Sequence, residues 1–157
     1  AERLRRKASS NGPVHLPVRV LGKTTTTLNF VPIDYVVNGM VHIGGLENSA
    51  GGTYHLANPY PTPNDLWLPN ICRLLHVTGV QLVDQTAFNA VPATKMETWF
   101  QKQMAFYYMY LQGEPRFDCS RTLDALRGTG IECPCVTVEF IETIVGWYVD
   151  YLKASQA

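Results

Sequence analysis

The stretch "NFVPIDYVVNGMVHI", Asn29–Ile43, changes character where a proline is followed by an aspartate. The residues that lead into it, "TTTTLNFV" at 24–31, are β-branched and then apolar, which is typical of a strand. Pro32 ends such a strand because it has no amide to donate. After Asp34, apolar residues recur at three- and four-residue spacings, which predicts a helix with one buried face.

Upstream of this stretch, residues 1–24 are expected to form a basic, loop-like segment. "RLRRK" at 3–7 places four cations in five residues. "SSNGPVHLPVRVLGK" at 9–23 contains several turn-forming residues and predicts a loop. The remainder, 25–157, is expected to be one folded subdomain.

Composition indicates an ordinary globular chain. Its 157 residues are enough for one domain with a real core. Thirteen basic residues balance thirteen acidic ones, so overall charge gives no reason to expect nucleic acid or an anionic membrane as a partner. The longest strongly apolar run, "MAFYYMYL" at 104–111, is too short to cross a bilayer. We therefore expect a cytoplasmic protein.

Further strands are predicted at Thr53–Ala57 and at 80–84, and capping patterns and apolar stripes predict about five helices. The fold class is therefore α/β, or an α+β-like fragment with few short strands. Such a small sheet is meagre for an independent fold, which suggests a missing partner sheet. In the helix that begins after Thr137, Ile144 and Tyr148 fall on one apolar stripe and are expected in the core.

The segment Met96–Gln112 predicts one long helix whose second half is apolar on every side. A helix of this kind must be covered on every side or must border something apolar. Packing against the C-terminal helix would cover one face. For the other face, three covers remain open: an acyl channel, a missing nucleotide-binding domain, or a second copy of this chain.

No catalytic motif is visible. There is no glycine loop of a dinucleotide site, no P-loop lysine and no HExxH pair, so we expect no catalytic, cofactor-binding or metal-ligating residue in this chain. The four cysteines lack the spacing typical of zinc sites and are expected to be free thiols.

Four segments occur in the order of one familiar series: "NFVPIDYVVNGMVHI", "GGTYHLANPYPTPNDL", "RFDCSRTLDALRGTGIECP" and "TVEFIETIVGWYVDYL". Together they resemble the C-terminal segment of extended short-chain dehydrogenase/reductases, the thioester-reductase and NAD-dependent epimerase/dehydratase group. Sugar epimerases usually carry an Arg-Asp-aromatic sequence where this chain reads Leu28-Asn29-Phe30. In the epimerases that arginine would bind the diphosphate of the nucleotide sugar through its two-pronged guanidinium group. Its absence here favours the thioester reductases.

The resemblance implies the substrate-binding C-terminal subdomain of a Rossmann-type oxidoreductase that uses NAD(P) to reduce an acyl thioester, carried on coenzyme A or on a carrier protein. It also implies that the nucleotide-binding and catalytic parts lie upstream, so this chain alone would be inactive and would bind no NAD(P). Two alternatives stay open: a non-catalytic α+β binding module, and the corresponding part of a sugar epimerase or dehydratase.

Six residues are the candidates for lining the substrate cleft, and four of them follow predicted strands, where ligands of α/β sheets gather. They are Asn29, Phe30, Asn58, Tyr60, Tyr107 and Met109. The alternative for Asn58 and Tyr60 is a simple turn before the next helix.

Overall fold

The structure is a computed structural model that describes residues 12–155. The basic run at 3–7 lies outside these residues. The chain divides into two compact units, and each is described by itself. Unit 1 comprises the described residues of 1–28, 63–114 and 137–157, and unit 2 comprises 29–62 and 115–136.

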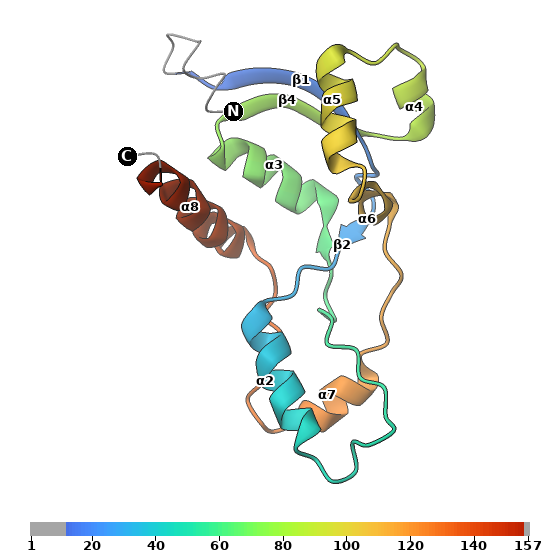
Figure 1. The fold of residues 1–157 in the computed structure, drawn as a ribbon, viewed down its shortest axis with the longest axis vertical. Helices are drawn as coiled ribbons and strands as arrows, with labels where there is room; N and C mark the ends of the chain where they lie inside the picture. Colours follow the sequence, from blue (N-terminus) through green and yellow to red (C-terminus); the bar gives the residue numbers. More distant parts are fainter. Residues whose placement is uncertain (1–11, 156–157) are drawn as a thin grey trace. The chain divides into compact units, whose positions relative to one another are not determined.

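Unit 1 is built on two parallel strands, β1 (Val14–Leu21) and β4 (Val77–Val83), which lie side by side in Figure 1. Its helices are α3 (Asn64–Leu74), α4 (Gln85–Asn89), α5 (Lys95–Met104), α6 (Tyr108–Gln112) and α8 (Val138–Ala154). Its core comprises Val18 and Val20 of β1 with Leu111 of α6. Apolar residues of β4 and of the helices, Trp67 and Phe100 among them, pack around these three.

One ion pair joins distant parts of unit 1. Glu97, in the first turn of α5, is 2% exposed and accepts hydrogen bonds from Arg19 of β1 at Nε (2.7 Å) and Nη2 (2.9 Å). The same carboxylate accepts the backbone amides of Arg19 (2.9 Å) and Thr94 (2.8 Å), and Thr94 Oγ1 accepts the Glu97 amide in return. Arg19 therefore neutralises a carboxylate that also caps the helix, and β1 and α5 are held together.

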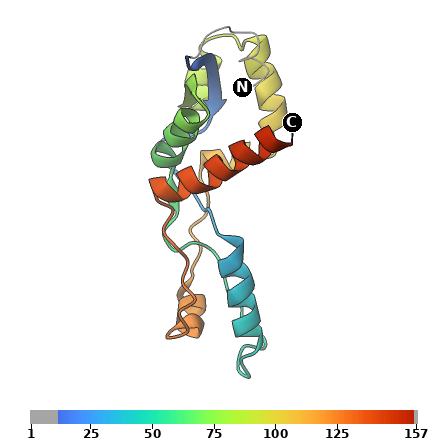
Figure 2. The same ribbon diagram turned by 90° about the vertical axis from the view of Figure 1, so that its left-hand side faces the viewer.

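Unit 2 contains α2 (Ile33–Gly44) and α7 (Ser120–Leu126), which lie side by side in Figures 1 and 2. Its core comprises Tyr35, Ile43 and Leu126. Gly39 is part of this packing, because a Cβ there would lie 2.6 Å from Leu56 Cδ2. The helix predicted after Asp34 is thus present, but its buried face consists of Tyr35, Gly39 and Ile43. Most of the apolar stripe predicted from the spacing is wrong, because Val37, Met40 and Val41 are exposed.

Several predicted elements differ from the structure. The loop predicted over 9–23 contains β1, the longest strand of the described residues. Apolar residues alternate along it, and Pro17 lies at a shift in register between His15 and Val18, where its missing amide is tolerated. Proline is a weaker argument against a strand at such a bulge than in a regular ladder.

The predicted strands at 24–31 and at Thr53–Ala57 are almost absent. Only Thr27–Leu28 (β2) forms a short ladder, with Thr62–Pro63 (β3), and residues 53–57 form no strand. Two carbonyls of the latter segment accept side chains of the α7 region instead: His55 O accepts Thr122 Oγ1 at 2.9 Å, and Ala57 O accepts Cys119 Sγ at 3.6 Å. A β-like sequence does not form a strand where it has no strand to pair with.

The long helix predicted over Met96–Gln112 is also wrong, because α5 ends at Met104 and α6 begins at Tyr108. The Tyr107 amide donates to Met104 O at 2.8 Å, a tighter turn than an α-helix makes. Consecutive aromatic residues at this point have lower helix propensity than the residues before them.

The apolar stripe of α8 is not the core that the sequence predicts. This helix packs against α3, but Ile141 is its only buried residue among those described. Ile144 is 54% exposed and Tyr148 is 52% exposed. Trp147 and Tyr151 beside them are also exposed, and their rings stack with centroids 5.6 Å apart.

Candidate functional site

Two of the residues predicted to line a cleft, Asn29 and Asn58, are hydrogen-bonded to each other within unit 2. Asn29 Nδ2 donates to Asn58 O at 2.8 Å, and the Asn58 amide donates to Asn29 Oδ1 at 2.9 Å. Asn58 Nδ2 donates to Phe30 O at 3.1 Å. The structure thus brings Asn29 and Phe30 next to Asn58, and their role in lining a substrate cleft stays a prediction.

Burial separates these residues by role. Asn58 is 2% exposed, and its Oδ1 accepts the Tyr60 amide at 2.9 Å, which closes a turn of the kind that asparagine side chains form. The Asn58 side chain therefore holds the backbone in place, as in the turn alternative. Tyr60 is 67% exposed and Phe30 is half-buried, so these two rings are the groups of this cluster that a ligand can reach.

The other two predicted residues, Tyr107 and Met109, belong to unit 1. Their side chains are 53% and 66% exposed. With the exposed Phe106 and Tyr110 they form what we call the aromatic cluster, in which Phe106 lies edge-on to Tyr107 at 5.5 Å between ring centroids. Leu111 is buried beneath, so only one side of this region is covered by unit 1.

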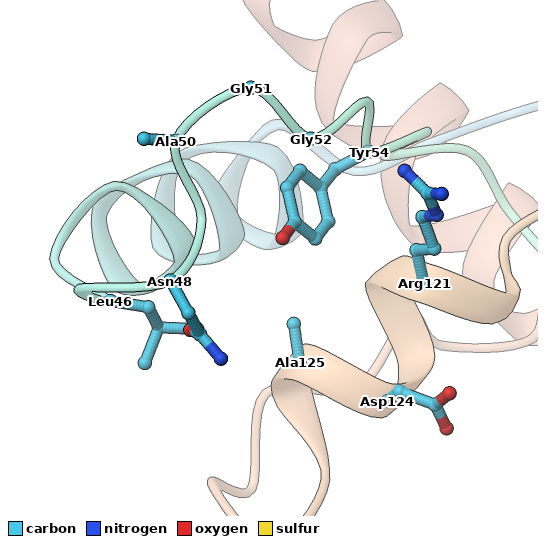
Figure 3. Close-up of a pocket in the computed structure, with 9 residues that line it drawn as sticks. All are labelled: Leu46, Asn48, Ala50, Gly51, Gly52, Tyr54, Arg121, Asp124 and Ala125. Carbon is cyan, nitrogen blue, oxygen red and sulfur yellow. The ribbon is translucent and has the colours of Figure 1, made fainter.

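A pocket that the sequence analysis missed lies within unit 2 (Figure 3). It is open to solvent and has a volume of about 510 Å³. Its lining comes from the loop after α2, from Tyr54 and from α7: Leu46, Asn48, Ala50, Gly51, Gly52, Tyr54, Arg121, Asp124 and Ala125. None of the six predicted residues lines it. The available signal was the Asp-Cys-Ser-Arg sequence at 118–121, within one of the four segments that carry the resemblance, since it contains Arg121.

Local constraints shape this pocket. Gly51 has a φ of +74°, a conformation that glycine adopts without strain. A Cβ on Gly52 would lie 2.7 Å from Tyr54 Cε2, so glycine is needed for the tyrosine ring to pack on the loop. On the other wall, Thr122 is fully buried and donates to His55 O, which fixes α7 next to the segment that carries Tyr54.

Charges around the pocket are paired in part. The Asp124 carboxylate forms an ion pair with Arg127. The pKa of Asp118 is lowered, first by the hydrogen bond from the Ser120 amide (2.9 Å) and to a smaller extent by His55 and Arg121. The side chains of Asn48, Tyr54 and Arg121 make no hydrogen bond with other residues of the described chain.

One cysteine of unit 2, Cys133, has a thiol of low reactivity. Burial of Cys133 raises the pKa of its thiol to about 11, and the neighbouring Cys119 and Cys135 add to this effect. Cys119 itself is buried. A thiol with so high a pKa is protonated at neutral pH and is a poor nucleophile. Within residues 12–155, no three potential metal ligands lie together.

The residues present do not fit a nicotinamide dinucleotide. In the described chain, β1 is followed by β2 and not by a helix, and the turn from β4 to α4 contains no glycine. Backbone amides are therefore not offered to a pyrophosphate at a helix start, as dinucleotide sites require. In the same residues, no helix has the length and apolar character needed to span a bilayer.

Comparison with known proteins places this architecture in a class. No protein-family model matches the chain, and no curated protein matches it either. Five solved chains do match. One of them is a terminal reductase domain, which is a thioester-reductase-like extended short-chain dehydrogenase/reductase. The resemblance and the α/β class predicted from the sequence are thereby confirmed.

In particular, the chain is similar to the crystal structure of the terminal R domain from the myxalamid PKS-NRPS biosynthetic pathway, with a TM-score of 0.56 and 25% sequence identity. The match covers 96% of this chain and 47% of that chain. This chain thus spans about half the length of the solved domain.

Proposed function

We propose that this chain is the substrate-binding part of an NAD(P)-dependent oxidoreductase that reduces an acyl thioester carried on coenzyme A or on a carrier protein. The observation that carries the proposal is the similarity to a terminal reductase domain over 96% of the chain. The match covers only 47% of that domain, so we assign the nucleotide and the catalytic groups to the rest of the intact protein.

The aromatic cluster supports an apolar substrate. Met109 and Phe106 are 66% and 72% exposed, which is unusual for apolar side chains grouped on one surface. Methionine adapts to irregular apolar ligands, and tyrosine offers an apolar ring with a hydroxyl that stays in water. An acyl chain is a ligand that such a surface would hold.

The experiment is a reduction assay on the intact protein that contains this chain. Oxidation of NADH or NADPH is followed with an acyl-coenzyme A and with an acyl-pantetheine thioester as substrates. Turnover of either thioester supports the proposal. No turnover of any thioester, with nucleotide-sugar conversion instead, would assign the protein to the epimerase/dehydratase alternative.

Variants of the cluster then test substrate binding. Replacing both Tyr107 and Met109 by Ala is expected to raise KM for a long-chain thioester roughly tenfold, the loss of one or two buried apolar contacts, with less effect on a short-chain one. Lys102→Ala is a matched control, because this exposed residue is in α5 and outside the cluster. Equal effects on both chain lengths would show that the cluster does not bind the acyl group.

A further inference from the structure

Three side chains that can donate hydrogen bonds, and that have no hydrogen-bond partner among the described residues, line the unit 2 pocket. Figure 3 shows the Tyr54 ring between the loop and α7, with Arg121 extending from α7 beside it and Asn48 on the loop side. They offer a guanidinium fork, a phenol and an amide. Since none of them is hydrogen-bonded to another described residue, all three can turn to a ligand.

The walls that carry these donors are held in place by buried contacts. Thr122 is fully buried and ties α7 to His55, the neighbour of Tyr54. Gly52 lets the loop pack closely on the Tyr54 ring, because a Cβ at this position would lie only 2.7 Å from Tyr54 Cε2. A site on such supports loses little conformational freedom when a ligand binds.

The two acids near the site are already engaged. Asp124 lines the pocket, and its charge is matched by Arg127. Asp118 accepts the Ser120 amide, and Arg121 contributes only the smallest of the effects that lower its pKa. The Arg121 fork is thus the charged group of the lining that has no hydrogen-bonded carboxylate among the described residues.

We propose that this pocket binds the phosphate group of a small organic phosphate monoester. Arg121 would bind two phosphate oxygens through its fork, and Tyr54 and Asn48 would donate to the remaining positions. A volume of about 510 Å³ leaves space for an organic group against Leu46, Ala125 and the Tyr54 ring. The proposal goes beyond the oxidoreductase assignment, since no residue of this pocket belongs to the predicted acyl-binding set.

The test uses amide NMR spectra of the 157-residue chain, titrated with phenyl phosphate, inorganic phosphate and benzoate. Phenyl phosphate should shift amides of 46–54 and 120–125, and should bind more tightly than either of the other two. Inorganic phosphate binding as tightly would show a site for the free ion. Benzoate binding as tightly would contradict the assignment of a phosphate.

Two variants and a control locate the contact. Arg121→Gln should weaken phenyl phosphate binding roughly tenfold or more, the loss expected for a charge-assisted pair, and Tyr54→Phe should weaken it severalfold. Arg116→Gln, an exposed arginine of unit 2 outside the lining, should leave it unchanged. Equal losses in the two arginine variants, or none in Arg121→Gln with dispersed spectra, would overturn the proposal.

Discussion

At the scale of single residues, Glu97 is a buried carboxylate that accepts four hydrogen bonds. It accepts Arg19 through two side-chain nitrogens and one amide, and it also closes the capping box with Thr94. These hydrogen bonds, the one from the Arg19 side chain first, hold the pKa of the carboxyl well below its usual range. The ionised form therefore stabilises the fold at neutral pH.

The expected consequence is an acid-dependent loss of stability. The contribution is present above the unfolded pKa of about 4.3 and disappears as pH falls towards the lower folded value. Glu97→Gln should lower the free energy of unfolding by roughly 2–3 kcal/mol at pH 7, the usual value of hydrogen bonds to a charged group. Urea unfolding at pH 7 and pH 3 measures it. The difference between the two proteins should shrink at pH 3, and a difference independent of pH would contradict this role.

Asn58 gives the second prediction at this scale. Asn58→Ala removes the buried side chain that binds Phe30 O and the Tyr60 amide, and leaves both groups without that partner. We expect a loss of about 1–3 kcal/mol in urea unfolding. Asn48→Ala, which removes an exposed asparagine from the same unit, should change stability by less than about 0.5 kcal/mol. Equal effects of the two substitutions would mean that the hydrogen bonds of the Asn58 side chain do not stabilise this turn.

At the scale of elements, α8 shows how sequence and structure diverge. Its periodic pattern predicts a buried stripe, whereas the structure buries Ile141 and exposes Ile144 on the next turn. Ile141→Ala is expected to cost about 2–5 kcal/mol, as a large-to-small change in a core does. Ile144→Ala should cost less than about 0.5 kcal/mol in this chain. Thermal melts of the two variants provide the comparison, and a larger shift for Ile144→Ala would restore the sequence-based assignment.

The elements that sequence could predict are those whose signals are local. The sequence "TKME" at 94–97 predicts a capping box, which Thr94 and Glu97 form. Thr137 caps α8 by accepting the Phe140 amide at 3.2 Å. The failures depend on partners far away in the chain. Residues 53–57 have a strand-like sequence but lie against α7, and β1 pairs with a strand more than fifty residues later. Single-sequence periodicity carries no information on such partners.

At the scale of the whole molecule, the class predicted from four segments of the sequence agrees with the similarity to a terminal reductase domain. The six residues proposed to line a substrate cleft stay a prediction. Asn29, Phe30, Asn58 and Tyr60 come together in unit 2, but the Arg121 pocket was missed, since the loop that completes it, 46–52, contains no residue type that marks a site. The sequence at 118–121 marks the arginine, but the loop that faces it across the pocket is recognised only in three dimensions.

The last prediction concerns the nicotinamide cofactor. The described residues offer no glycine turn between a strand and a helix, so the 157-residue chain should show no NADH or NADPH binding in a calorimetric titration. The intact protein, titrated in the same way, should bind one of them. A micromolar Kd for the chain alone would mean that the nucleotide is bound by residues outside the familiar geometry.

The contact between the Arg19 amide and Glu97 has a consequence for aggregation. Amides along a strand face alternate edges, and the Gly22 amide donates to Val83 beside β4, so the Arg19 amide faces the opposite edge of β1. An unpaired edge is a template for a strand from another molecule. A carboxylate at that amide, with Leu111 O accepting the Lys23 amide further along, leaves an incoming strand little to pair with. Protonation of Glu97 in acid would weaken its hydrogen bond with the Arg19 amide. The edge of β1 would then be open to a strand from another molecule, which is how fibrils begin.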